Sequence, residues 1–121
     1  MSFDWNKFIE LSERIMEKAN SEEEFRTVVS RSYYGAFKQA NDQYKKETFD
    51  DPKMSVHNVV IMYFQKHDKM LYRSIGLWLG RLKDKRVTSD YKAAILITKK
   101  DACESLDRAK SIVNKIVQID N

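Results

Sequence analysis

The chain has 121 residues, of which 42% are hydrophobic and 33% are charged, and its formal net charge is +4. This length supplies one hydrophobic core, so we expect a single domain over residues 1–121. Three Gly, one Pro and one Cys argue against an all-β fold, an internal disulfide and a cysteine metal cluster.

The sequence also argues against a membrane or secreted protein. No apolar run approaches the roughly 20 residues of a membrane span. Asp4, Lys7 and Glu10 interrupt any N-terminal signal peptide. A reducing, cytoplasmic compartment without membrane contact is therefore expected.

The positive charge is unevenly distributed along the chain. Residues 1–24 carry three basic and seven acidic groups, whereas residues 69–100 carry nine basic and two acidic groups. An anionic partner would be attracted to the second stretch. A solvent-exposed helix face rich in Lys is the alternative interpretation of the same pattern.

Helical spacing of apolar residues begins close to the N-terminus. Asp4 is predicted to cap a first helix that continues to about Asn20. Ser21 and Glu24 then have the spacing of a capping box, in which the Ser oxygen accepts a backbone N–H and the Glu side chain reaches back. The chain is therefore expected to turn and begin a second helix here.

This second helix is predicted from about Glu22 to Lys46, which is long for a small domain. Asp50-Asp51-Pro52 is expected to end the segment, because a residue that precedes Pro is displaced from helical geometry. The buried stripe of the helix is predicted to consist of Phe25, Val28, Val29, Ser32, Tyr33, Ala36, Phe37, Ala40 and Tyr44.

Two further helices are predicted in the middle of the chain. Ser55 is expected to cap a helix over about Val56–Lys66, and the next is expected over about Lys69–Arg86. Gly76 and Gly80 lie four residues apart in the latter. Each Gly inside a helix costs about 1 kcal/mol relative to Ala, so we expect another helix to approach closely at these positions.

The region from Val87 to Ile97 is expected to form a linker. Thr98 and Asp101 have the spacing of a cap for a last helix, which continues to about Val117. Five helices with short connections predict an all-α, up-and-down helical bundle.

Few residues indicate catalysis or metal binding. His57 and His67 lack the spacing of metal ligands, and they are interpreted as a partly buried packing residue and a charge near a helix C-terminus. Cys103 is interpreted as a small core residue. All three Gly lie in helical segments, so no Gly-rich loop is available to hold a phosphate. We therefore expect no metal and no cofactor.

Two segments carry polar and aromatic residues that packing alone does not explain. Residues 26–37 place small side chains among aromatic ones, which would also suit a close helix crossing. Residues 81–91 combine four basic groups with Ser89, Asp90 and Tyr91, which could bind a phosphate and a base. The alternative for this second segment is compensation of the helix dipole followed by an Asp-based turn.

These two segments carry a family resemblance. The run Val29-Ser30-Arg31-Ser32-Tyr33-Tyr34-Gly35-Ala36-Phe37 resembles the S-R-x-Y-Y-x-x-F signature of small bacterial and archaeal HEPN-domain proteins. His57 begins a segment similar to the H-x-x-V-x-x-x-F pattern of that group, with a shift. Arg86-Val87-Thr88-Ser89-Asp90-Tyr91 resembles its R-x-x-x-D-Y segment. The resemblance covers about residues 20–117, including the closing helix.

The resemblance implies an up-and-down helical bundle, often dimeric, in a family associated with RNA and nucleotides. Many members are toxins of toxin–antitoxin pairs, encoded beside a minimal nucleotidyltransferase. Active members cut RNA without a metal through an R-x(4–6)-H motif, in which His assists proton transfer and Arg stabilises the phosphorane charge. In this chain no His follows Arg86 at that spacing, and neither His57 nor His67 has an Arg at that distance upstream.

The residues and the resemblance together predict an HEPN-like protein of a toxin–antitoxin or defence-type system that binds a nucleotide or RNA and is not a standard ribonuclease. Arg86 would contact a phosphate, Tyr91 would stack on a base, and Asp90 would hold a ribose hydroxyl or Arg86. The supporting residues would be Ser30, Arg31, Tyr33 and Tyr34.

Two other functions stay open at this point, and a homodimer is expected from the resemblance. The first alternative is a divergent RNA-cleaving toxin. The second is a non-catalytic, dimeric interaction module that pairs with a nucleotidyltransferase through the face that carries Gly76 and Gly80.

Overall fold

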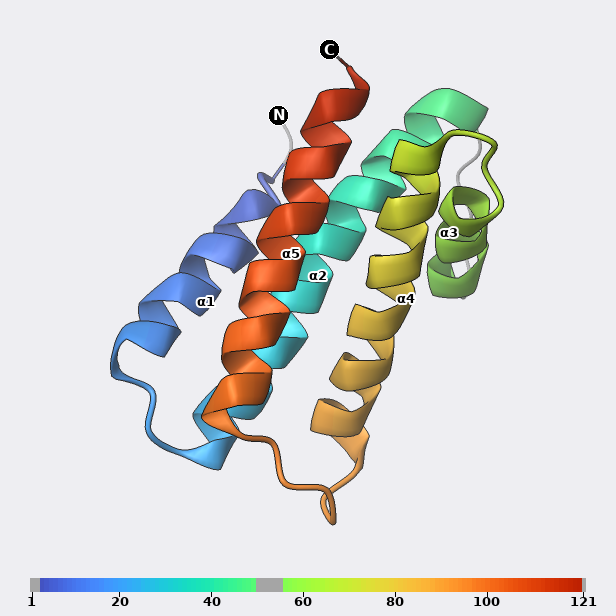
Figure 1. Ribbon diagram of the computed structural model, residues 1–121. Helices are drawn as coiled ribbons and strands as arrows, with labels where there is room; N and C mark the ends of the chain where they lie inside the picture. Colours follow the sequence, from blue (N-terminus) through green and yellow to red (C-terminus); the bar gives the residue numbers. More distant parts are fainter. Residues whose placement is uncertain (1–2, 50–55, 121) are drawn as a thin grey trace.

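The computed structural model describes residues 3–49 and 56–120, and these contain five α-helices and no strand. The predicted all-α helical bundle is therefore confirmed. The helices are α1 (Asn6–Lys18), α2 (Glu22–Thr48), α3 (Val56–Gln65), α4 (Met70–Tyr91) and α5 (Lys99–Ile119). In Figure 1, α1, α2, α4 and α5 run alongside one another, and the short α3 lies at one edge, next to α4.

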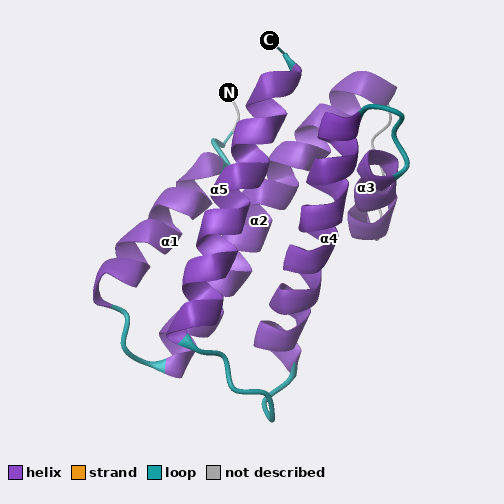
Figure 2. Ribbon diagram, viewed as in Figure 1, coloured by secondary structure: helices purple, strands orange, loops and turns teal. Residues whose placement is uncertain are grey.

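α2 is the central element, because it packs against all four other helices. The loop between α1 and α2 and the loop between α4 and α5 lie at the same end of the bundle (Figure 2). The predicted stripe of α2 is confirmed, with Phe25 half-buried and the other eight residues buried. Among the described residues, no helix has both the length and the apolar character needed to cross a membrane.

The helix starts partly follow the predicted caps. Asp4 Oδ1 accepts a hydrogen bond from the amide of the first residue of α1, and at α5 the Thr98 and Asp101 side chains each bond the other's backbone N–H. At α2 the prediction was half wrong. The hydroxyl of Ser21 donates to the Glu24 carboxylate at 2.8 Å and accepts no amide. Glu24 does reach back, since it accepts the Asn20 N–H at 3.0 Å.

The expected stop at Asp50-Asp51-Pro52 and the expected cap at Ser55 lie outside the described residues. The end of α2 itself is described. Phe49 adopts a left-handed conformation with φ 57°, and its N–H donates to the Lys45 oxygen at 2.9 Å.

The two glycines of α4 mark the crossing of α3, as the sequence predicted. A Cβ at Gly76 would overlap the backbone nitrogen of Gln65 and lie 2.8 Å from its Cα. A Cβ at Gly80 would lie 3.0 Å from the side-chain nitrogen Nε2 of Gln65. The approaching helix belongs to the same chain. The two glycines therefore do not provide the free face for a partner protein that the interaction-module alternative assumed.

The linker predicted from Val87 to Ile97 was wrong in its first part, because α4 continues to Tyr91. Arg86 and Ser89 are buried against the bundle, and this packing extends the helix by more than a turn. Arg26, from α2, then stabilises the helix end. Its guanidinium donates to the backbone oxygens of Thr88, Ser89, Lys92 and Ile95.

Candidate functional site

Arg86 lies in a cluster of polar and aromatic residues where α2, α3 and α4 meet. Its side chain is only 9% exposed, and its guanidinium carbon lies 5.3 Å from the ring centroid of Tyr33 and 5.4 Å from that of Tyr34. Its Nη1 is 3.6 Å from Asp90 Oδ2, at the long end of ion-pair distances. The buried Nε has no hydrogen-bond partner among the described residues. The positive charge is thus buried with incomplete pairing.

His57 joins this cluster from α3. Its Nδ1 lies 2.6 Å from the Tyr33 hydroxyl, and its ring stacks on Phe37 with centroids 4.2 Å apart. Burial, followed by the positive charges of Arg86, Lys83 and Lys38, lowers the pKa of His57 to about 4. The imidazole is therefore neutral at pH 7. The predicted role of His57 as a partly buried packing residue is confirmed.

Tyr33 connects the histidine to the arginine. Burial raises its pKa, so the hydroxyl stays protonated at pH 7. Its ring is fully buried, with the guanidinium of Arg86 near the ring and His57 at the hydroxyl. Arg86 and His57, far apart in the chain, are thus in contact with one side chain.

The structure brings six of the seven predicted site residues together. Ser30 Oγ donates to Asp90 Oδ2 at 3.4 Å, and the Arg31 guanidinium lies 5.8 Å from the centroid of the Tyr34 ring. With His57, these six residues form the junction cluster, which consists of Ser30, Arg31, Tyr33, Tyr34, His57, Arg86 and Asp90.

Tyr91 is the predicted residue that the structure does not bring to Arg86. It is 74% exposed, and it follows Arg86 by five residues, which places it about 140° away around the helix. It lines a hollow of about 420 Å³, together with Arg26 and the acidic residues Glu22, Glu23 and Asp90. A base stacked on Tyr91 would therefore lie on another side of α4 than a phosphate at Arg86.

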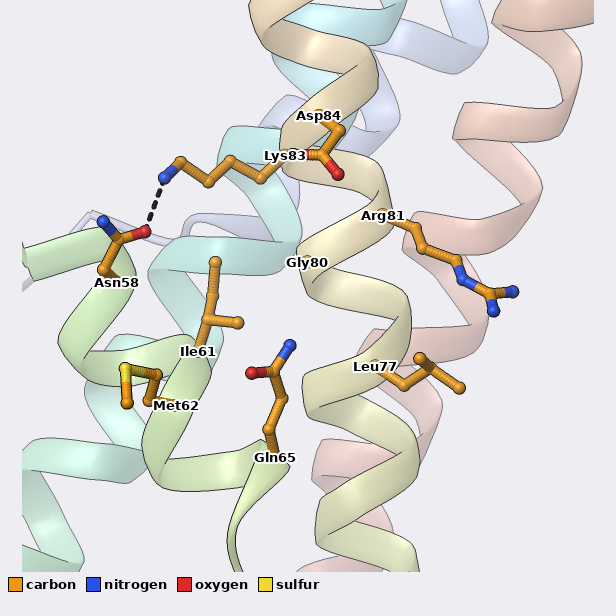
Figure 3. A pocket seen from close by; sticks show the side chains of 9 residues that line it. All are labelled: Asn58, Ile61, Met62, Gln65, Leu77, Gly80, Arg81, Lys83 and Asp84. Carbon is orange, nitrogen blue, oxygen red and sulfur yellow. Dashed lines mark hydrogen bonds between the residues drawn. The ribbon is translucent and has the colours of Figure 1, made fainter.

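A groove of about 380 Å³ between α3 and α4 adjoins the junction cluster (Figure 3). Lys83 reaches from α4 across one end of it and donates to Asn58 Oδ1 at 2.6 Å. Asn58 follows His57 in the chain, and Lys83 lies one turn before Arg86. The residues lining the groove are Asn58, Ile61, Met62, Gln65, Leu77, Gly80, Arg81, Lys83 and Asp84.

Lys38 and Lys83 also place their charges near His57, and neither was among the predicted site residues. Lys38 follows Arg31 by seven residues and Tyr34 by four, so helical spacing could have placed all three on one face. Lys83 belongs to the basic stretch already noted, but no local pattern indicates that it faces Asn58. That contact depends on how α3 crosses α4.

A second polar cluster, around Glu47, is satisfied within the protein. Burial raises the pKa of Glu47, but hydrogen bonds from Tyr63, Tyr72 and Gln43 outweigh it and leave the pKa lowered. Burial, followed by the same carboxylate, raises the pKa of Tyr63 to about 12. His67 stacks on Tyr72, with ring centroids 3.8 Å apart. The cluster holds α2, α3 and α4 together, because the side chains that surround Glu47 donate to its carboxylate.

Cys103 and His67 are two further residues that the sequence singled out. Cys103 is exposed, so its prediction as a core residue was wrong. Its neighbour Ala102 is the one that faces the core, and the next residue points about 100° away around the helix. His67 lies just after the end of α3, and its Nδ1 is 3.1 Å from the Lys69 backbone nitrogen and 3.2 Å from Asp68 Oδ1. No group of metal-ligating side chains occurs in the described part of the chain.

The comparisons with known proteins do not identify this site. No family model matches the chain, and neither a curated protein nor a solved structure is significantly similar to it. The geometry of the junction cluster is therefore the basis for a function.

Proposed function

We propose that this protein binds phosphate groups of a nucleotide or of an RNA strand at the junction of α2, α3 and α4. The observation that carries the proposal is the buried, incompletely paired guanidinium of Arg86. Burying a charge without full pairing costs free energy, and a phosphate oxygen would supply the missing charge-assisted hydrogen bonds.

The local charge supports an anionic ligand. Arg86, Lys83 and Lys38 all lower the pKa of the His57 ring, so their positive charges converge on one place. Asp90 is the one carboxylate within the described residues that pairs with any of these three cations. An excess of positive charge is left around His57, and it would attract a polyanion.

A salt titration with a lysine double variant tests this proposal without disturbing the buried Arg86. We expect Lys38→Gln/Lys83→Gln to weaken the binding of a labelled single-stranded RNA about tenfold in fluorescence anisotropy. The slope of log K against log salt should fall by about 0.7 for each phosphate that the variant no longer neutralises. ATP should compete with the RNA.

The matched control is Lys7→Gln/Lys18→Gln, which removes two exposed lysines from α1. This variant should bind RNA nearly as well as the wild type. Equal weakening in both double variants would mean that binding is non-specific, and it would contradict a site at the junction.

A divergent ribonuclease is the second candidate, favoured by the shared contact of Arg86 and His57 with Tyr33. An unprotonated His57 could accept the proton of a 2′-hydroxyl while Arg86 stabilises the phosphorane. RNA incubated without divalent metal should then give 2′,3′-cyclic phosphate ends, and His57→Gln should abolish them. Intact RNA after incubation with the wild type would exclude this function.

Pairing with a nucleotidyltransferase, a toxin–antitoxin context and a homodimer follow from the HEPN resemblance alone. Light scattering on the purified protein, alone and with the product of a neighbouring nucleotidyltransferase gene, tests the partner and the dimer directly.

A further inference from the structure

Where α4 packs against α5, two arginines lie on one tryptophan ring, Arg81 and Trp78 from α4 and Arg108 from α5. The guanidinium carbon of Arg108 lies 3.4 Å from the centroid of the Trp78 ring, and that of Arg81 lies 4.6 Å from it. All three side chains line a hollow of about 140 Å³. Arg81 also lines the edge of the α3/α4 groove, but Figure 3 shows its guanidinium extending toward α5, and no residue of the junction cluster lines this hollow.

The two guanidinium groups have no carboxylate partner among the residues that the structure describes. Glu104 precedes Arg108 by four residues, an order and spacing that favour an ion pair on a helix. Its carboxylate instead lies 3.8 Å from Lys100 Nζ. The indole face attracts both cations without neutralising them, so two positive charges stay available above one rigid ring.

The neighbouring charges are otherwise compensated. Lys85, which lines the same hollow, pairs with Asp101 at 3.0 Å, and that contact also helps to lower the pKa of Asp101. Glu104 lines the hollow as well and opposes an anion there. The uncompensated charge of the hollow therefore resides on Arg81 and Arg108.

We propose that Arg81 and Arg108 bind one phosphate-like oxyanion in this hollow. Two planar guanidinium groups, held by the same ring, match the oxygens of a phosphate and lose little side-chain entropy on binding. The hollow is smaller than the ~300–1,000 Å³ of pockets for drug-sized ligands, so it accepts a single group. The phosphate is either free in solution or part of an RNA backbone, and the site does not depend on the junction cluster.

The fluorescence of Trp78 reports on this site. The chain has two tryptophans, so Trp5→Phe leaves Trp78 as the sole indole. In this background we expect sodium phosphate to cause a saturable change in emission that sodium chloride at equal ionic strength does not cause. A change with a single-stranded RNA oligonucleotide and none with phosphate would assign the site to the RNA backbone.

Three variants in the same background decide the proposal. Arg81→Gln/Arg108→Gln should remove the saturable change, whereas Lys7→Gln/Arg14→Gln, which removes two charges from α1, should keep it. Glu104→Gln should tighten binding about threefold, the scale of one exposed charge pair. A change that survives the removal of both arginines, or the absence of any saturable change with phosphate and RNA alike, would overturn the proposal.

Discussion

Among single residues, two arginines on neighbouring helices differ in how fully their guanidinium groups are paired within the protein. Arg26 is 20% exposed, pairs with Glu22 at 2.8 Å and donates to backbone oxygens in the last turn of α4 and just after it. Its bonding capacity is used inside the protein. Arg86 is more deeply buried, but its closest carboxylate is 3.6 Å away and its Nε is unpartnered within the described residues. The first arginine is therefore structural, and the second is the candidate for a ligand.

Arg26→Met is expected to reduce the free energy of unfolding by about 2 kcal/mol, because hydrogen bonds to a charged group contribute on this scale. Urea unfolding followed by circular dichroism measures the change. Arg26→Lys should recover only part of it, since an ammonium cannot reach oxygens in several directions. Arg14→Met, at a position of α1 outside this network, should stay within about 0.5 kcal/mol of the wild type. Equal effects of the two Met variants would contradict the capping role.

His57 should make the protein less stable in mild acid. Its pKa is about 4 in the folded protein, against an ordinary value of 6.5. Between these values the unfolded chain binds a proton that the folded chain does not, so the free energy of unfolding falls as the pH falls through this window. The thermal midpoint should decrease from pH 7 to pH 5, and it should decrease less in His57→Phe. The pKa values of Glu22, Glu24 and Asp101 are lowered from ordinary values of 4.5, 4.5 and 3.8, so these groups do not account for a change between pH 7 and pH 5. Parallel curves for both proteins would contradict the prediction.

Among the helices, the crossing of α3 and α4 depends on the two glycines to different degrees. At Gly76 an added Cβ would meet backbone atoms of Gln65, which cannot move without shifting α3. At Gly80 the nearest atom is the end of the flexible Gln65 side chain, at 3.0 Å. The closest backbone approach therefore occurs at Gly76 alone.

Gly76→Ala is expected to cost about 1–3 kcal/mol, as overpacking does in other cores. Gly80→Ala should be neutral or stabilising, because helix propensity gains up to about 1 kcal/mol. Chemical denaturation of the two variants provides the comparison, since each adds one methyl group to the same helix. Equal destabilisation would indicate that α3 and α4 are packed as closely at Gly80 as at Gly76.

Across the whole molecule, stability is expected to differ between the centre of the bundle and its edge. α2 contacts every other helix, whereas α3 packs chiefly on α4. α3 also has no acidic residue in its first turn and no basic residue in its last, and its Val59 and Met62 are each 45% exposed. Helices with little buried surface open locally before the protein unfolds.

Amide hydrogen exchange should therefore be fastest in α3 and slowest in the middle of α2. We expect a difference of at least about tenfold in protection between residues 58–64 and residues 28–40, measured by mass spectrometry or NMR. Equal protection of the two segments would mean that α3 opens only when the whole bundle unfolds.

The five helices, most of their boundaries and the buried face of α2 were predictable from the amino-acid sequence. These features depend on a period of 3.6 residues and on caps that involve neighbours in the chain. The caps at Asp4 and Thr98 were predictable for this reason, and the close approach at Gly76 was predictable from the cost of Gly in a helix.

The assembly of the candidate site, in contrast, depends on how the helices pack. The extension of α4 depends on Arg26 from another helix, and the contact of His57 with Tyr33 depends on where α3 lies. Arg86 and Tyr91 share one segment of the sequence, but the rotation of the helix turns Tyr91 away from Arg86. Contacts of this kind leave no local pattern in the chain, because packing between elements sets them.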